Sequence, residues 1–131
     1  MTRIPLRLLL AEDMEDDAVL ILDALERHGY QPRHTRVMTA AAFREALAAD
    51  EYDIILCDHS MPSFDANEAL EILHDAGKDT PMIIVSGTIG EATAVEAMRC
   101  GAADFLLKDS LLRLGPAVER ELREAESRRR Q

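Results

Sequence analysis

The stretch IILCDHSMP, residues 54 to 62, places four apolar residues directly before Asp58 and is interrupted by Pro62. A short apolar run without alternation is typical of a strand that is buried on both faces, as in a parallel sheet. The stretch therefore poses a question that the rest of the chain must answer: why does an apolar strand end on a carboxylate?

Composition limits the classes of protein to which the chain can belong. At 131 residues and 47% hydrophobic, the chain is expected to form one domain with an aliphatic core. Its formal net charge of -10 argues against direct binding of nucleic acid, since phosphate binding needs a basic surface. No apolar run approaches the roughly 20 residues of a membrane span. Cys57 and Cys100 lack metal-binding or redox spacing, and no signal peptide is recognisable, so a cytoplasmic location with reduced thiols is expected.

Apolar runs alternate with segments of helical spacing, which is the pattern of repeated βα units in an α/β protein with a parallel sheet. The expected strands are LRLLLA (6–11), PRHTRV (32–37), DIILC (53–57), MIIVS (82–86) and DFLLK (104–108). The run at 32–37 is polar and therefore suits an edge of the sheet.

The segments between the strands have the spacing of amphipathic helices. Two stripes are clearest, formed by Ala18, Ile21, Leu22 and Leu25 and by Ala69, Ile72, Leu73 and Ala76. Gly29 and Gly77 follow these stripes at positions where a left-handed cap ends a helix. The sequences DANE and TIGE, which begin at Asp65 and Thr88, fit a capping box and predict two helix starts.

Two further helices are expected on weaker patterns. One is alanine-rich, at 40–49, with Phe43 and Leu47 facing inward, and the other has Pro116 near its first position. The apolar face of the last helix comprises Leu114, Val118, Leu122 and Ala125. Alternating charge then dominates, so we expect a single domain over 1–131 with its core at about 6–122 and a charged helical tail or connector at 123–131.

Ionisable and hydroxyl side chains follow four of the expected strands. Glu12 and Asp13 follow the first strand, Asp58 the third, Ser86 ends the fourth, and Lys108 ends the fifth. Each has an ordinary structural explanation when considered alone: acids at a helix N-terminus, a turn residue, a loop or a solvated strand end. Ligands of open parallel sheets bind beyond the carboxyl ends of the strands, so the joint placement favours a site.

The acids next to this group, Asp16 and Asp17, are interpreted only as favourable charges at a helix N-terminus.

The chemistry of this group points to phosphoryl transfer. Carboxylates of Glu12, Asp13 and Asp58 repel one another and invite a hard divalent cation, Mg²⁺ or Mn²⁺, which phosphate oxygens complete. Lys108 would neutralise one phosphoryl oxygen and Ser86 would donate a hydrogen bond to another. Asp58, the most central acid, is then free to accept the phosphoryl group as an acyl phosphate.

These motifs resemble the receiver domain of two-component response regulators over residues 6 to 122. The resemblance rests on Glu12-Asp13, IILCDHSMPSFD with Asp58, VSG with Ser86, and GAADFLLK with Lys108. It implies a flavodoxin-like, doubly wound, five-stranded parallel sheet of order 2-1-3-4-5 with helices on both faces.

The same resemblance implies roles for individual residues. The metal would be held by Asp13, Asp58 and the backbone carbonyl of Ser60, with Glu12 acting through water. Ser86 and Phe105 would form the switch that alters the face made by the last two helices and the strand between them. If the domain forms a homodimer, we expect this face to be its interface. Family members usually have proline after the lysine in a cis bond, whereas this chain has Asp109, so a trans bond is expected here.

The leading functional hypothesis is a phosphoacceptor rather than an ordinary enzyme. It would take a phosphoryl group from a sensor histidine kinase or a histidine phosphotransfer protein, assist its own slow dephosphorylation, and act on a downstream protein or an attached module. The alternative is a receiver-like interaction domain that works without phosphorylation, for which Asp109 is the one supporting residue. A small metal-dependent hydrolase is a third reading, which lacks an evident acid or base beyond the carboxylates.

Overall fold

The computed structural model describes residues 2–59, 61–87 and 90–131. Within these residues five strands and five α-helices alternate, with one 3-10 helix before the last α-helix. The strands are β1 (Ile4–Ala11), β2 (Tyr30–Val37), β3 (Ile54–Cys57), β4 (Met82–Ser86) and β5 (Asp104–Leu107). The helices are α1 (Glu15–Arg27), α2 (Ala40–Ala49), α3 (Ala66–Asp75), α4 (Glu91–Arg99), η1 (Lys108–Arg113) and α5 (Leu114–Arg129).

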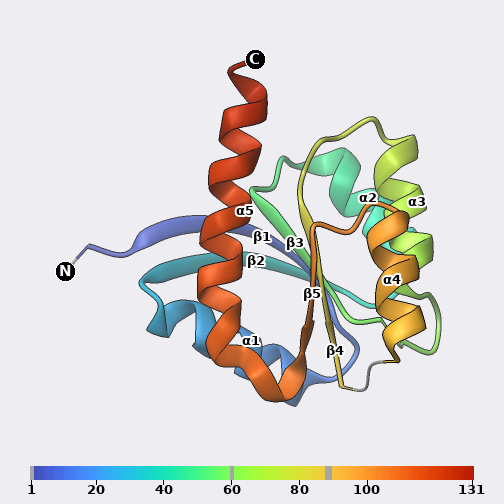
Figure 1. Ribbon diagram of the computed structural model, residues 1–131, viewed down its shortest axis with the longest axis horizontal. Coiled ribbons are helices and arrows are strands. Elements are labelled where there is room, and N and C mark those ends of the chain that lie inside the picture. The colour runs from blue at the N-terminus through green and yellow to red at the C-terminus, as the bar shows by residue number, and fades with distance from the viewer. Residues whose placement is uncertain (1, 60, 88–89) are drawn as a thin grey trace.

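The strands form one parallel sheet of order β2-β1-β3-β4-β5. Figure 1 shows α1 and α5 on one face of this sheet and α2, α3 and α4 on the other. This arrangement confirms the flavodoxin-like, doubly wound fold and places the polar strand β2 at an edge, as its sequence predicts.

Two apolar cores fill the space between the sheet and its two helical layers. Leu8 and Leu10 of β1 point to the core beneath α1 and α5, whereas Leu9 points to the core beneath α2 and α3. Neighbouring residues of a strand face opposite sides, so the apolar run of a central strand serves both cores. This explains why β3 is apolar at all four positions.

The termini of the helices test the local predictions. Gly29 and Gly77 have φ angles of 96° and 69°, which confirms the left-handed positions after α1 and α3. Asp65 caps α3 by accepting the backbone N–H of Glu68 at 2.9 Å. The start predicted for α4 was wrong, because a capping box that begins at Thr88 would put Gly90 in the first turn, whereas the helix begins only at Glu91. Thr88 itself lies outside the described residues.

The physical reason for the late start of α4 is the residue before it. Gly90 is the N-cap and has an extended backbone, with φ at -94° and ψ at 143°. Glycine has a low helix propensity, which suits a position before the helix rather than inside its first turn.

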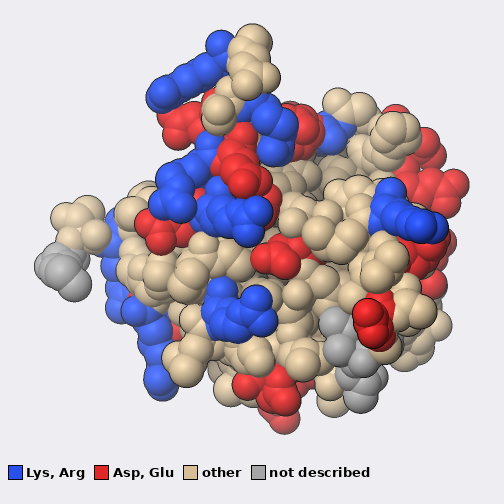
Figure 2. Space-filling view, in the orientation of Figure 1, with Lys and Arg blue, Asp and Glu red and all other residues tan. Residues whose placement is uncertain are grey.

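The carboxyl-terminal region begins with a feature that the sequence did not predict. Lys108 starts the 3-10 helix η1 rather than ending β5, and α5 follows at Leu114, with Pro116 in its first turn. The helix continues to Arg129, and Figure 2 shows basic and acidic side chains interspersed on its projecting part. No helix in the described part of the chain is both long and apolar enough to cross a membrane.

Candidate functional site

The strand register brings the site residues to one edge of the sheet. Ala11 of β1 pairs with Cys57 of β3, and Ser86 of β4 pairs with Leu107 of β5. The ladder extends one residue further where the Asp58 N–H donates to the carbonyl of Ala11 at 2.8 Å. The residues that follow these pairs are Glu12, Asp58, Gly87 and Lys108, so the backbones of Glu12, Asp58 and Lys108 emerge at the same edge of the sheet, with β4 between Asp58 and Lys108.

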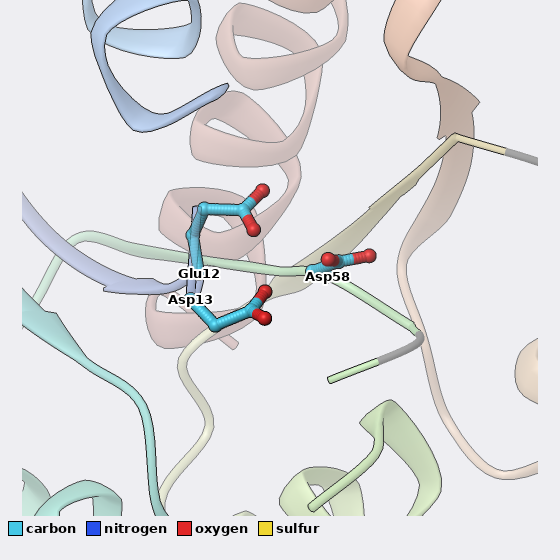
Figure 3. A group of neighbouring side chains, drawn as sticks. All are labelled: Glu12, Asp13 and Asp58. Atoms are coloured by element: carbon cyan, nitrogen blue, oxygen red, sulfur yellow. The ribbon is translucent and has the colours of Figure 1, made fainter. Parts of the chain in front are cut away.

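Three carboxylates gather at this edge, as Figure 3 shows for Glu12 and Asp13 beside Asp58. One carboxylate oxygen of each lies within 4.8 Å of the others, a spacing that could hold a metal ion. Glu12 is 0% exposed and Asp58 is 7% exposed, whereas Asp13 is only half-buried. The carbonyl of Ser60, expected as a further ligand, belongs to a residue outside the described part of the chain.

Lys108 supplies the positive charge among these acids. Its Nζ lies 2.7 Å from Glu12 Oε1 and 3.3 Å from Asp58 Oδ2. It also lies 2.6 Å from Asp17 Oδ2, on the first turn of α1. The ammonium therefore lies within ion-pair distance of three carboxylates.

The charges at this site shift the pKa values of two groups. Burial raises the pKa of Glu12 from 4.5 to about 7, and the charge of Asp58 adds to that effect, whereas the hydrogen bonds from Lys108 and from the Met14 N–H oppose it. Burial alone would lower the pKa of Lys108, but the hydrogen bonds to Asp17 and Glu12 and the charge of Asp58 outweigh it and raise that pKa. The lysine therefore stays an ammonium at neutral pH, while Glu12 can exchange a proton.

Ser86 and Phe105 lie next to this cluster in the sheet. Ser86 is the last residue of β4 and is 1% exposed. Phe105, in β5, is half-buried, and its ring lies 6.2 Å from the ring of His59 with a tilt of 38°. His59 therefore packs against the aromatic side chain proposed as the switch, a contact that the sequence did not predict.

The substitution of Asp109 for proline leaves the loop without a cis bond: no peptide bond among the described residues is cis. The Asp109 side chain is exposed and accepts the Ser110 hydroxyl at 3.3 Å. Ion pairs of Lys108 involve Glu12, Asp17 and Asp58, and among the described residues none involves Asp109. The extra acid therefore does not join the carboxylate cluster.

Sequence reasoning missed Asp17. The expectation that Asp17 lies in the first turn of a helix is correct, but its ion pair with Lys108 spans 91 positions of the chain. A usable signal was present: Asp17 lies four residues before Ile21, which is buried, so both share one face of α1. An acid in line with a buried stripe, at the end of the helix nearest the strand termini, faces the site.

The comparisons with known proteins agree with this geometry. Residues 8–115 match the response regulator receiver domain. The chain therefore belongs to this family, and the acidic site lies where such domains bind Mg²⁺.

Three relatives illustrate the similarity. The chain is 30% identical over 103 residues to the regulatory protein AtoC of Escherichia coli, a match that covers 78% of this chain and 22% of AtoC. Two solved structures also resemble it. The receiver domain of the Francisella response regulator 1452 has a TM-score of 0.79 and 26% identity, covering 91% of this chain and 98% of that chain. The receiver domain of a signal transduction histidine kinase from Syntrophus aciditrophicus has a TM-score of 0.74 and 27% identity, covering 91% of each chain.

The chain thus spans about a fifth of the length of AtoC. Membership of the family supports a role in two-component signalling as a signalling domain rather than an ordinary enzyme.

Proposed function

We propose that this domain accepts a phosphoryl group on Asp58 from the phosphohistidine of a sensor kinase or a histidine phosphotransfer protein. The observation that carries the proposal is the position of Asp58 at the end of β3, 7% exposed, beside two further carboxylates and 3.3 Å from the Lys108 ammonium. A carboxylate oxygen of Asp58 attacks phosphorus as the P–N bond of phosphohistidine breaks, and the electron pair of that bond returns to the donor imidazole.

The residues around Asp58 support this reaction by charge. Lys108 offers an ammonium to the phosphoryl oxygens, and the hydroxyl of Ser86, at the end of the neighbouring strand, would donate a hydrogen bond to another. Such donors act more strongly where the groups are largely buried, as the Lys108 and Asp58 side chains are. The same residues would hold the phosphoryl group until water removes it.

The donor set fits a hard divalent cation, Mg²⁺ or Mn²⁺. Glu12, Asp13 and Asp58 offer only carboxylate oxygens, which these ions prefer, and the cluster has more acids than the single lysine neutralises. Asp13 and Asp58 would bind the ion directly, together with the carbonyl of Ser60, and Glu12 would act through water. When bound, the ion offsets the negative charge of the cluster and of the incoming phosphoryl group.

The partner-binding part of the proposal concerns the face made by α4, β5 and α5. Phe105 lies in β5, half-buried and in contact with His59, so a change near Asp58 has a short path to this face. Phosphorylation adds negative charge and acceptor oxygens at Asp58, which would draw Ser86 and let Phe105 turn inward. The face would then bind a downstream protein, an attached module or a second copy of the domain.

The alternative, an interaction domain that works without phosphorylation, receives no support from the geometry of Asp109, whose side chain turns to Ser110 instead of the acids. A hydrolase is similarly disfavoured, because the ring of His59 packs against Phe105. We further propose that residues 1–131 form a single domain, in the cytoplasm, with 123–131 as a charged helical tail or connector.

Intact-mass spectrometry tests the proposal directly. The protein is incubated with acetyl phosphate, with and without Mg²⁺, and compared with Asp58→Asn and with the control Asp53→Asn, whose acid pairs with Arg7 at the other end of β3. One phosphoryl adduct that needs Mg²⁺, is lost in Asp58→Asn and persists in Asp53→Asn is the expected result. An adduct on Asp58→Asn, or none on any protein, would refute it.

A further inference from the structure

The ion pair between Asp17 and Lys108 has no part in the function proposed above. Lys108 Nζ lies 2.6 Å from Asp17 Oδ2, closer than to Glu12 at 2.7 Å or Asp58 at 3.3 Å. Asp17 is also the most exposed of the three acids, with 33% of its side chain accessible. The lysine is therefore shared between the buried cluster and a carboxylate near the surface of α1.

Asp17 stands apart from the acids that could hold a metal ion. The carboxylates close enough to share an ion are Glu12, Asp13 and Asp58, and Asp17 is not among them. A divalent cation and a phosphoryl group would both change what Glu12 and Asp58 offer to Lys108. Asp17 would keep its carboxylate for the lysine throughout.

We propose that Asp17 is a positioning residue that holds Lys108 on the α1 side of the site and thereby restrains phosphorylation of Asp58. The inference rests on the proposed function. A phosphoryl group on Asp58 needs a donor from Lys108, and Asp17 competes for the same ammonium. The negative charge of Asp17 also repels an anionic phosphodonor at this edge of the sheet.

The position of Lys108 can be observed without phosphorylation, because the chain has only two lysines, Lys78 and Lys108. Lys78 follows α3 in the chain, and its side chain donates to the carbonyl of Asp50, the residue that caps the end of α2, at 3.3 Å, so it serves as an internal reference. The matched control is Asp16→Asn, which removes the same charge one residue before Asp17. The Asp16 side chain is exposed and, among the described residues, makes no ion pair.

The experiment compares wild type, Asp17→Asn, Asp17→Glu and Asp16→Asn, each labelled with ¹³C,¹⁵N-lysine. NMR of the metal-free proteins should show the side-chain resonances of Lys108 displaced in Asp17→Asn alone, with those of Lys78 unchanged. Mg²⁺-dependent phosphorylation by acetyl phosphate should be about three- to tenfold faster in Asp17→Asn than in Asp16→Asn, the effect of one nearby unit charge at a partly solvated site. Asp17→Glu, which keeps the carboxylate, should return the rate towards that of wild type.

Each outcome bears on the inference. Equal Lys108 resonances in the two Asn variants would overturn the anchoring role, and an equal or slower rate in Asp17→Asn would overturn the restraint. If none of the proteins, wild type included, were phosphorylated, both the proposed function and the restraint would fail. A displaced Lys108 signal in that case would leave the anchor standing, which separates the two failures.

Discussion

Replacing Glu12 by Gln should stabilise the metal-free protein at alkaline pH and leave its stability unchanged in acid. Gln has the shape of the protonated glutamic acid but no charge, so it removes the cost of an ionised group that is 0% exposed. In the wild type, burial and the charge of Asp58 raise the pKa of Glu12 from 4.5 to about 7.

The sign follows from proton binding. Between pH 4.5 and about 7 the folded state holds a proton on Glu12 that the unfolded state has lost, so the free energy of unfolding falls as the pH rises through this range. The contribution is fully present below about pH 4.5 and lost above about pH 7, and it amounts to about 3 kcal/mol. The Gln variant lacks this loss and should exceed the wild type by up to about 3 kcal/mol at pH 8.

Urea unfolding followed by far-UV circular dichroism measures this difference at pH 5, 6, 7 and 8 in the presence of EDTA. The matched control is Glu15→Gln, an exposed acid in the first turn of α1, which should change stability by less than about 0.5 kcal/mol at every pH. Parallel curves for the wild type and Glu12→Gln across the range would refute the assignment of this titration to Glu12. Added Mg²⁺ should favour ionised Glu12, so the affinity of the wild-type protein for Mg²⁺ should fall as the pH drops below about 7.

Two further predictions concern packing. Gly115→Ala should lower the free energy of unfolding, measured in urea, by about 1–3 kcal/mol, because a Cβ at this position would clash with Cγ of His28. A Cβ in the control Gly87→Ala meets nothing within 4 Å. Equal stability of the two variants would contradict the close approach of α1 and α5. In the folded protein, exposed Cys100 should react rapidly with one equivalent of a disulfide reagent. Cys57, whose pKa is raised by burial, should react only on unfolding. Rapid labelling of both thiols would contradict the burial of β3.

The sequence predicted the buried acids of this site well because their position follows from strand periodicity alone. An apolar run that ends on Asp58, and another that ends before Glu12, places both carboxylates beyond the same edge once the strands are parallel. No long-range information beyond the direction of the strands is needed. The same reasoning correctly placed Ser86 at the end of β4.

The prediction failed where geometry depends on more than one element. Lys108 was assigned to the end of a strand, but it begins η1, which turns the chain towards α1. The contact with Asp17 then depends on the path of that turn and on the rotation of α1 about its axis, and neither can be read from local spacing. The contact between His59 and Phe105 likewise depends on the strand order, in which β5 lies two strands from β3, across β4.

The charge balance of the site links its parts. Glu12, Asp17 and Asp58 pair with one ammonium, and Asp13 lies beside Glu12 and Asp58, so the metal-free cluster has more negative than positive charge and can lower its energy by keeping a proton on Glu12. A divalent cation would replace that proton, and a phosphoryl group would restore the excess of negative charge. Each event changes the acceptors available to Lys108, whose partner on α1 is held by a different element from those on the strand ends. Under the proposed function, the position of Lys108 would be the variable through which metal binding, phosphorylation and α1 influence one another.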